Sequence, residues 1–423
     1  MAATRKTELC YCSVMDMAKH WGQTAYMSKK RKYISHQYVN CGKKQKLAEI
    51  HQALNSDPVD IETLQRAATS KGGLFTDELR RRVWPKLLNI NVYELPYKPG
   101  RAGRENQKDY NQIVMDVRRS MKRFPKCMLS TERDVLQEQL IDVILEVLRC
   151  NPQLNYYQGY HDVAVTLLLV VGERMTIAML HTLSKYHLRD FMDPTMDSTK
   201  HILNYLMPLL EEVDKELHDF MIRAEVGTIF ALSWLITWYG HVLLEPKLTL
   251  RLYDFFLASH PMMPIYLAAT IVLHREKEVK QTECDMAMVH HLLSRIPQDL
   301  PYERLIGQSQ ELFVRFPPSL LAKRAELRSR KSQSMSNFKT FQLATLHQRP
   351  DSVLQRLTTS SKRAARHSGL DEALPRDGGQ RWGKGSRMVK MAVLGLSATL
   401  GAAVFAVAQT ALDWGPDVLL QLF

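Results

Sequence analysis

The chain has 423 residues, of which 45% are hydrophobic and 24% are charged. A chain of this length and apolar content can bury a large core, which excludes a mostly disordered protein. Its 19 Gly and 18 Pro residues exclude a fibrous one. The six cysteines are too few and too scattered for a disulfide scaffold, so we expect free thiols in a reducing compartment.

The net charge of +13 is concentrated in two flanking regions of the chain. Residues 1–46 carry ten Lys and Arg against two acidic residues, and residues 321–390 carry sixteen against five. Residues 47–320 carry 31 basic and 35 acidic residues, which is a net charge of −4. Basic flanking regions are at least as compatible with binding to a membrane surface as with binding to nucleic acid. Because the middle of the chain is slightly acidic, we expect no nucleic-acid partner.

Residues 1–46 are predicted to form a flexible basic arm. They lack the continuous apolar run that a signal peptide needs. They contain several thiol and imidazole groups, but the spacing of these groups matches no common zinc-binding pattern. We therefore expect no metal site among Cys10, Cys12, His20, His36 and Cys41.

Residues 47–320 have the apolar periodicity of helices, with the core of the domain at about 75–316. In one segment apolar residues recur every fourth position, at Leu136, Leu140, Ile144 and Leu148. No sustained strand-like alternation and no Asn-Gly hairpin occurs, so the predicted fold class is all-α. Similar stripes run through 75–90, 107–123, 198–223, 226–240, 247–258, 263–278 and 285–295. Helix-end signals are provided by Pro208, Pro246, Pro261, Pro264 and Pro297.

The apolar stretch 252–273 could be mistaken for a membrane span. It is interrupted by Asp254, His260, Pro261 and Pro264. A charge and an imidazole would be costly in lipid. We therefore expect two core helices joined by a turn.

After the helical body, residues 321–390 are rich in Ser, Arg, Lys, Gln and Gly, which predicts a flexible basic linker. Residues 391–412 then contain no charged residue. As a helix these 22 residues would reach about 33 Å, enough to span a bilayer. Basic residues precede the span and acidic ones follow it, so the positive-inside rule places the body in the cytosol. Residues 413–423 would form a short lumenal tail.

Two local motifs are the candidates for chemistry, because metalloprotease, serine-hydrolase and kinase motifs are absent. The first is Ile113-x-x-Asp116-x-x-Arg119. Its acid and Arg lie three residues apart on one helix face, where the acid could orient the guanidinium or form an ordinary surface ion pair. The second is Tyr156-Tyr157-Gln158-Gly159-Tyr160, which could equally be a helix entry in which the glycine lets two backbones approach.

Taken together, these motifs resemble those of TBC-domain proteins, a family of GTPase-activating proteins for Rab GTPases. The resemblance covers roughly residues 75–316, and with the predicted span the chain most resembles the membrane-anchored member of the endoplasmic reticulum. The matching stretches are Arg80-x-x-x-Trp84 of the opening helix, Ile113-x-x-Asp116-x-x-Arg119 of the arginine finger, Tyr157-Gln158-Gly159 of the glutamine finger, and Trp234 with Arg251–Phe256 of later helices. Tyr253 stands where Trp is more usual, which affects packing and not chemistry.

The resemblance implies an activator rather than an enzyme in its own right. Arg119 would spread its donors over the charge that builds up on the phosphoryl group of a GTP-bound Rab. Gln158 would orient the attacking water, and Asp116 would fix Arg119 or Gln158, with Tyr157 and Gly159 in support. No cofactor belongs to this chain, because GTP and Mg²⁺ arrive with the partner. The location implied is the endoplasmic reticulum or an early secretory membrane.

Two alternatives remain beside this interpretation. Arg118 is adjacent to the finger, but the motif register selects Arg119, and Arg118 lies on a different side of the helix from Asp116. The protein could also be a membrane-anchored adaptor that binds a Rab without accelerating hydrolysis. The presence of both Arg119 and Gln158 argues against that, since a pure adaptor needs neither.

Overall fold

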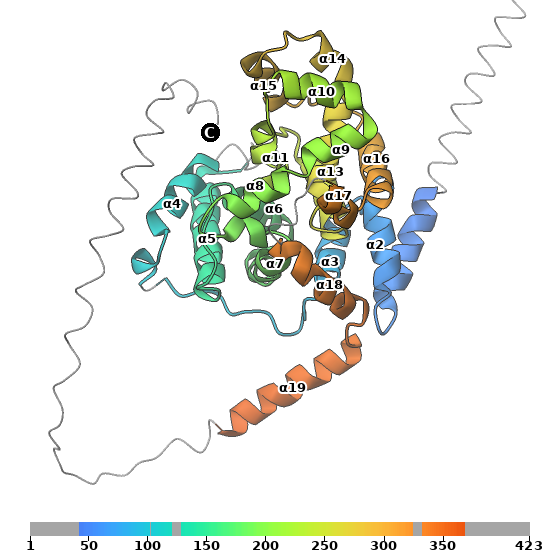
Figure 1. Ribbon diagram of the computed structural model, residues 1–423. Coiled ribbons are helices and arrows are strands. Elements are labelled where there is room, and N and C mark those ends of the chain that lie inside the picture. The colour runs from blue at the N-terminus through green and yellow to red at the C-terminus, as the bar shows by residue number, and fades with distance from the viewer. Residues whose placement is uncertain (1–41, 102, 121–127, 325–331, 369–423) are drawn as a thin grey trace, which may run out of the picture. The chain divides into compact units, whose positions relative to one another are not determined.

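The computed structural model describes residues 42–101, 103–120, 128–324 and 332–368. In these ranges all regular structure is helical, as the sequence predicts (Figure 1). The chain divides into two units, Met1–Thr358 and Thr359–Phe423. Most of the predicted basic arm, the predicted span 391–412 and the tail after it lie outside the described residues. No helix within the described part is long and apolar enough to cross a membrane.

A helix over residues 42–55 comes first in the described chain. It is followed by α2 (Ile61–Thr69), α3 (Asp77–Leu87), η1 (Arg104–Asn106), α4 (Tyr110–Arg119), α5 (Ser130–Arg149), α6 (Tyr160–Val171), α7 (Glu173–Tyr186), η3 (Arg189–Met192), α8 (Asp197–Leu203), α9 (Leu206–Val213) and α10 (Lys215–Arg223). The later elements are η4 (Ile229–Ala231), α11 (Leu232–Ile236), α12 (Pro246–Leu257), α13 (Met263–His274), α14 (Glu276–Gln281), α15 (Met286–Ser294), α16 (Tyr302–Arg315), α17 (Pro318–Arg324), α18 (Gln333–Leu346) and α19 (Asp351–Ser368).

Helices α6 and α13 form the centre of the core. Every residue from Tyr160 to Leu168 in α6 and from Met263 to Val272 in α13 is buried. A helix that is apolar on all sides must be surrounded by protein, and α13 packs against α9 and α16 (Figure 1). The prediction that 252–273 forms two core helices joined by a turn is confirmed by α12 and α13.

Asp254 of α12 is fully buried and explains how an acid fits in this apolar stretch. Its carboxylate accepts two hydrogen bonds of 3.0 Å from the Arg80 guanidinium and one of 2.8 Å from Trp84 Nε1. The backbone N–H of Leu74 donates a further bond of 3.0 Å. A Cβ on Gly73 would come within 2.5 Å of the carboxylate, so a side chain there would collide with it. A buried charge needs partners of this kind.

Helix boundaries differ from the predicted stripes at the prolines. Residues 198–223 form α8, α9 and α10 rather than one stripe, and the Asp214 side chain caps the start of α10. Pro208, Pro246 and Pro264 lie in the first turns of their helices and not at helix ends. Proline, which has no backbone N–H, is tolerated in the first turn because the N–H groups of that turn have no partner within the helix.

Residues 332–358 are part of the folded body, so the prediction of a flexible linker over 321–390 was wrong for this segment. The buried Asp190 carboxylate binds the N-terminus of α18. It accepts hydrogen bonds from the backbone N–H groups of Gln333 at 2.8 Å and Ser334 at 3.3 Å. A carboxylate at a helix N-terminus satisfies donors that the helix itself leaves open.

Two phenylalanines attach α18 to α7. Phe338 and Phe341 are each only 7% exposed. Phe341 stacks on Tyr186 with ring centroids 4.6 Å apart, and Phe338 meets His187 edge-to-face at 5.5 Å. The segment contains few large apolar residues, but two of them at spacing i, i+3 share one face of the helix. Composition averaged over 70 residues concealed this pair.

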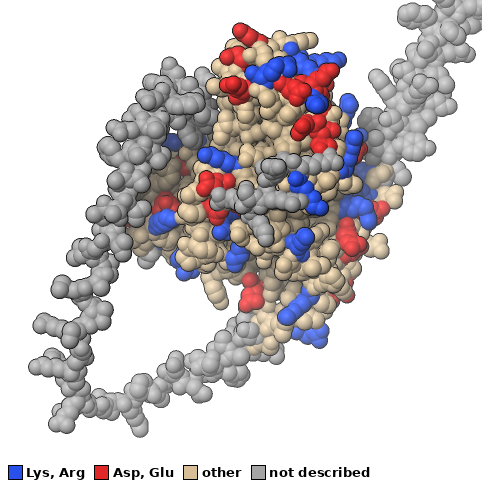
Figure 2. All heavy atoms as spheres, viewed as in Figure 1, with Lys and Arg blue, Asp and Glu red and all other residues tan. Residues whose placement is uncertain are grey.

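Acidic and basic side chains are interspersed over the face of the molecule in Figure 2. Neither sign predominates among the described residues on that face. This agrees with the nearly balanced count of charges over residues 47–320.

Candidate functional site

Helix α4 places Arg119 at the surface. Ile113, Asp116 and Val117 form the buried face of the helix, and Arg119 is its last residue. The Arg119 side chain is 66% exposed. A cation is favoured at a helix C-terminus, where the backbone carbonyls carry partial negative charge.

Asp116 joins α4 to the second motif, 40 residues away. Its carboxylate is 1% exposed and accepts a hydrogen bond of 2.9 Å from Tyr156 Oη on one oxygen. The other oxygen accepts a bond of 3.0 Å from Gln112 Nε2 and lies 3.8 Å from Arg119 Nη1. A separation of 3.8 Å is too long for a hydrogen bond, and the Arg119 end of the pair is exposed, so Arg119 lies near Asp116 but can reach outward.

Tyr156 acts as a fixed donor in this network. Burial raises the pKa of its phenol well above the usual value, and the charge of Asp116 raises it further. The phenol therefore stays protonated and donates to Asp116. Its oxygen also lies 3.2 Å from His161 Nδ1.

The loop before α6 carries Gln158 between two anchored neighbours. Tyr157 Oη donates a hydrogen bond of 2.9 Å to the Ile236 carbonyl. Gly159 is the N-cap residue that precedes α6, and its φ of +109° is a conformation that favours glycine. A Cβ there would also lie 3.0 Å from Thr237 Cγ2. Gln158 itself is half-buried, and within the described part of the chain its amide has no hydrogen-bond partner.

The geometry bears on the roles that the resemblance implied. Asp116 lies beside Arg119, whereas no hydrogen bond among the described residues joins it to Gln158. Arg119 forms the ion pair with Asp116. Arg118 is exposed on the same helix and is not a member of this pair.

Sequence reasoning gave no role to Gln112, Tyr156 or His161. Gln112 stands four residues before Asp116, a spacing at which Gln and Asp can bond on a helix, so this contact was recoverable. The contacts of Tyr156 and His161 depend on how α4 packs against the loop, which no local pattern reports.

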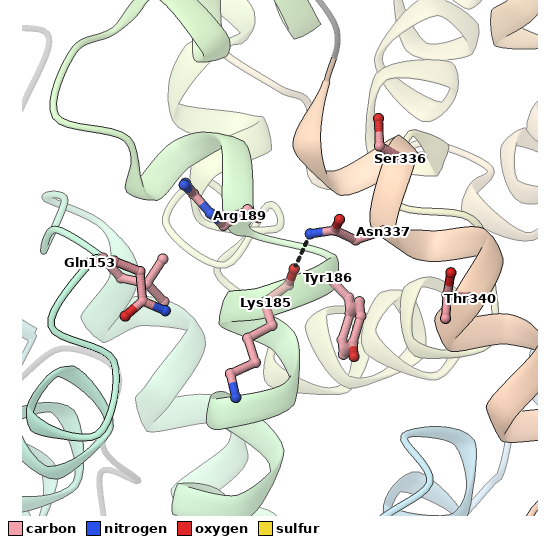
Figure 3. Close-up of a pocket in the computed structure, with 8 residues that line it drawn as sticks. Gln153, Lys185, Tyr186, Arg189, Ser336, Asn337 and Thr340 are labelled. Atoms are coloured by element: carbon pink, nitrogen blue, oxygen red, sulfur yellow. Dashed lines mark hydrogen bonds between the residues drawn. The ribbon is translucent and has the colours of Figure 1, made fainter.

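A cavity of about 410 Å³ lies elsewhere, between α7 and α18 (Figure 3). Its described lining includes none of the predicted site residues. In Figure 3 the Lys185 and Arg189 side chains extend in different directions, and the Asn337 amide donates to the Lys185 carbonyl. The lining residues are Gln153, Leu154, Lys185, Tyr186, Arg189, Ser336, Asn337 and Thr340.

No cluster of three or more His, Cys, Asp or Glu residues suited to a metal ion occurs in the described ranges. The cysteines and histidines considered in the basic arm lie outside them. The candidate site formed by the two motifs lies at the surface, because the Arg119 side chain is exposed. It presents the exposed Arg119 beside the buried Asp116 carboxylate, and Tyr156 connects that carboxylate to the loop that carries Gln158.

The described part of the chain is all-α, and its candidate site lies at the surface. The model of the Rab-GTPase-TBC domain family matches residues 77–280. Human TBC1 domain family member 20 is 57% identical to this chain over 385 residues, covering 91% of this chain and 94% of the human protein. This chain therefore belongs to the Rab-GTPase-TBC domain family.

More distant relatives extend the comparison. The GTPase-activating protein gyp10 of Schizosaccharomyces pombe is 30% identical over 257 residues, covering 60% of this chain and 68% of the yeast protein. The crystal structure of the Ypt/Rab-GAP domain of Gyp1p matches with a TM-score of 0.50 and 14% identity. It covers 64% of this chain and 97% of that domain, and it supports the fold alone.

Proposed function

We propose that this protein stimulates GTP hydrolysis by a Rab-family GTPase, to which it supplies Arg119 and Gln158 in trans. The observation that carries the proposal is the hydrogen bond between Tyr156 and Asp116, which ties the two motifs together. Relatives named as GTPase-activating proteins support it.

Arg119 has the chemistry that such an activator needs. Charge accumulates on the phosphoryl oxygens during GTP hydrolysis, and a planar guanidinium can bridge two of these oxygens. A finger of this kind raises the rate by about 10³–10⁵, which corresponds to about 4–7 kcal/mol. With 66% of its side chain exposed, Arg119 can enter a partner's active site without breaking a strong internal contact.

Gln158 supplies the second function. Its amide oxygen can accept a hydrogen bond from the attacking water, and its NH2 group can donate one to the phosphoryl group, in place of the glutamine of the GTPase. The Gln158 amide has no hydrogen-bond partner among the described residues and is therefore available for this task. GTP and Mg²⁺ are carried by the partner, so this chain contributes side chains and no cofactor.

The proposal is tested by single-turnover GTP hydrolysis with full-length protein and a panel of GTP-loaded Rabs. We expect acceleration on at least one Rab, and loss of that acceleration with Arg119→Ala and with Gln158→Ala. Arg118→Ala is the matched control, because it removes an exposed arginine beside the finger. Binding of a Rab without any acceleration would instead identify an adaptor.

We further propose that residues 391–412 anchor the protein in the membrane of the endoplasmic reticulum or early secretory pathway, with the body facing the cytosol. The uncharged run and the basic residues before it support this. Tethering would raise the local concentration of lipidated Rabs. Alkaline extraction of membranes should leave the full chain in the pellet and release a chain that ends at residue 390. Release of both would contradict the anchor.

A further inference from the structure

Both neighbours of Gln158 rest on one short segment, residues 236–239, which we call the platform turn. Tyr157 Oη donates to the Ile236 carbonyl at 2.9 Å. On the other side of the glutamine, the Gly159 backbone faces the Thr237 methyl so closely that a Cβ would lie 3.0 Å from it. The backbone of Gln158 is thus held before and after the residue by the same element.

The platform turn has a strained backbone. Trp238 has φ 48° and Tyr239 has φ 64°, although neither is glycine. Left-handed conformations are unfavourable for bulky residues, and two in succession are uncommon. Such strain persists only where surrounding contacts over-determine the conformation, and it concentrates at functional sites.

The core supplies those contacts. Trp238 and Tyr239 are 1% and 0% exposed. Tyr239 Oη donates to the Pro264 carbonyl at 2.9 Å, and its ring stacks on Phe256 at 5.9 Å. Trp238 meets Tyr253 edge-to-face at 5.4 Å. The turn is therefore fixed against buried residues of α12 and α13.

We propose that the platform turn positions Gln158, with Ile236 and Thr237 as positioning residues that act through Tyr157 and Gly159. This inference rests on the proposed function. A water-orienting amide must be placed to within a fraction of an ångström to be effective. Gln158 has no internal hydrogen bond among the described residues to set its position, so its backbone must carry that precision.

Two variants weaken the contacts of the platform turn and leave Gln158 in place. Tyr157→Phe deletes the hydrogen bond to Ile236 and keeps the ring. Thr237→Ser deletes the methyl that faces Gly159 and keeps the hydroxyl, which bonds the Ser233 carbonyl. Each is expected to lower kcat of the stimulated reaction about three- to tenfold, with KM for the Rab unchanged.

Matched variants separate positioning from general damage. Tyr266→Phe removes a buried tyrosine bond of the same type, from Tyr266 Oη to the Phe316 carbonyl, at a residue that makes none of the platform contacts described above. It should leave kcat near the wild-type value. Thr237→Val keeps the methyl and loses the hydroxyl, so kcat should fall less than with Thr237→Ser.

A double-mutant cycle with Gln158→Ala adds a kinetic result, which is read on the residual stimulation above the intrinsic rate of the Rab in that background. If Tyr157 acts through Gln158, Tyr157→Phe changes kcat severalfold in the wild type and not at all in the Gln158→Ala background. An equal fall in both backgrounds would overturn the proposal, because the tyrosine would then have a merely structural role.

Amide hydrogen exchange tests the anchoring independently of any activity. In Tyr157→Phe and Thr237→Ser, exchange should accelerate in residues 155–160 while α13 stays protected, and Tyr266→Phe should leave residues 155–160 unchanged. If no Rab is stimulated but the exchange result holds, the proposed function fails and the platform stands. Unchanged exchange in 155–160 would overturn the platform itself.

Discussion

Tyr156 donates a hydrogen bond of 2.9 Å to Asp116, and this single contact joins the helix that ends in Arg119 to the loop that carries Gln158. Asp116 is buried and so cannot move without disturbing α4. The two side chains proposed to enter the partner therefore share one internal support. Damage at that support should affect both.

Tyr156→Phe removes this bond and leaves the ring in place. A hydrogen bond to a charged group contributes about 1.5–3 kcal/mol, so we expect kcat of the stimulated reaction to fall about tenfold or more. Single-turnover hydrolysis measures this, with Tyr266→Phe as the control for loss of a buried hydroxyl. Full activity in Tyr156→Phe would show that Asp116 needs no support from the loop.

Asp254→Ala should destabilise the domain strongly. It leaves the Arg80 guanidinium, whose side chain is 8% exposed, without its main partner, and breaking a buried pair in this way costs about 3–5 kcal/mol. Asp77→Ala is the matched control, since Asp77 also bonds Arg80 but is 47% exposed, and should cost less than about 1 kcal/mol. Urea unfolding measures both, and equal losses would contradict the buried-pair account.

Stability should decrease as the pH falls from about 6.5 toward 4, in part because of His187. Burial lowers the pKa of His187 to about 3, so the folded chain stays neutral there while the unfolded chain takes up a proton. At pH 5 this linkage costs roughly 2 kcal/mol. His187→Phe should flatten the pH dependence of the unfolding free energy between pH 7 and 5. An unchanged slope would exclude His187 as its source.

Phe341→Ala should lower the free energy of unfolding of the whole domain and not only loosen α18. Truncating a buried phenylalanine costs about 3–5 kcal/mol, and Phe341 is 7% exposed against α7. Leu343→Ala lies on the same helix at 61% exposure and should change stability by about 0.5 kcal/mol or less. Chemical unfolding distinguishes them. A negligible effect of Phe341→Ala would mean that α18 is not part of the cooperative unit.

The local periodicity of apolar residues was sufficient to predict many of the helices. The stripe at Leu136, Leu140, Ile144 and Leu148 is α5, and the interrupted apolar run 252–273 is α12 and α13. Both signals depend only on nearby residues. Helix α18 was missed because its two anchoring phenylalanines act against distant partners, which an average over a basic linker cannot show.

The sequence predicts the candidate residues of the site but not the contacts that support them. The spacing of Asp116 and Arg119 placed them on one helix face, and the resemblance to TBC-domain proteins selected Gln158. The role of Tyr156 depends on the packing of α4 against a loop 40 residues away. The strain at Trp238 and Tyr239 is likewise imposed by the core, and nothing in their neighbouring sequence indicates it.

The most direct test of the account compares Arg119→Ala with Arg118→Ala in single-turnover GTP hydrolysis by the Rab that the wild-type protein stimulates best. The account predicts that Arg119→Ala loses the stimulation, a fall of about 10³-fold or more, while Arg118→Ala stays within a few-fold of wild type. Equal losses in the two variants, or stimulation that survives Arg119→Ala, would contradict it.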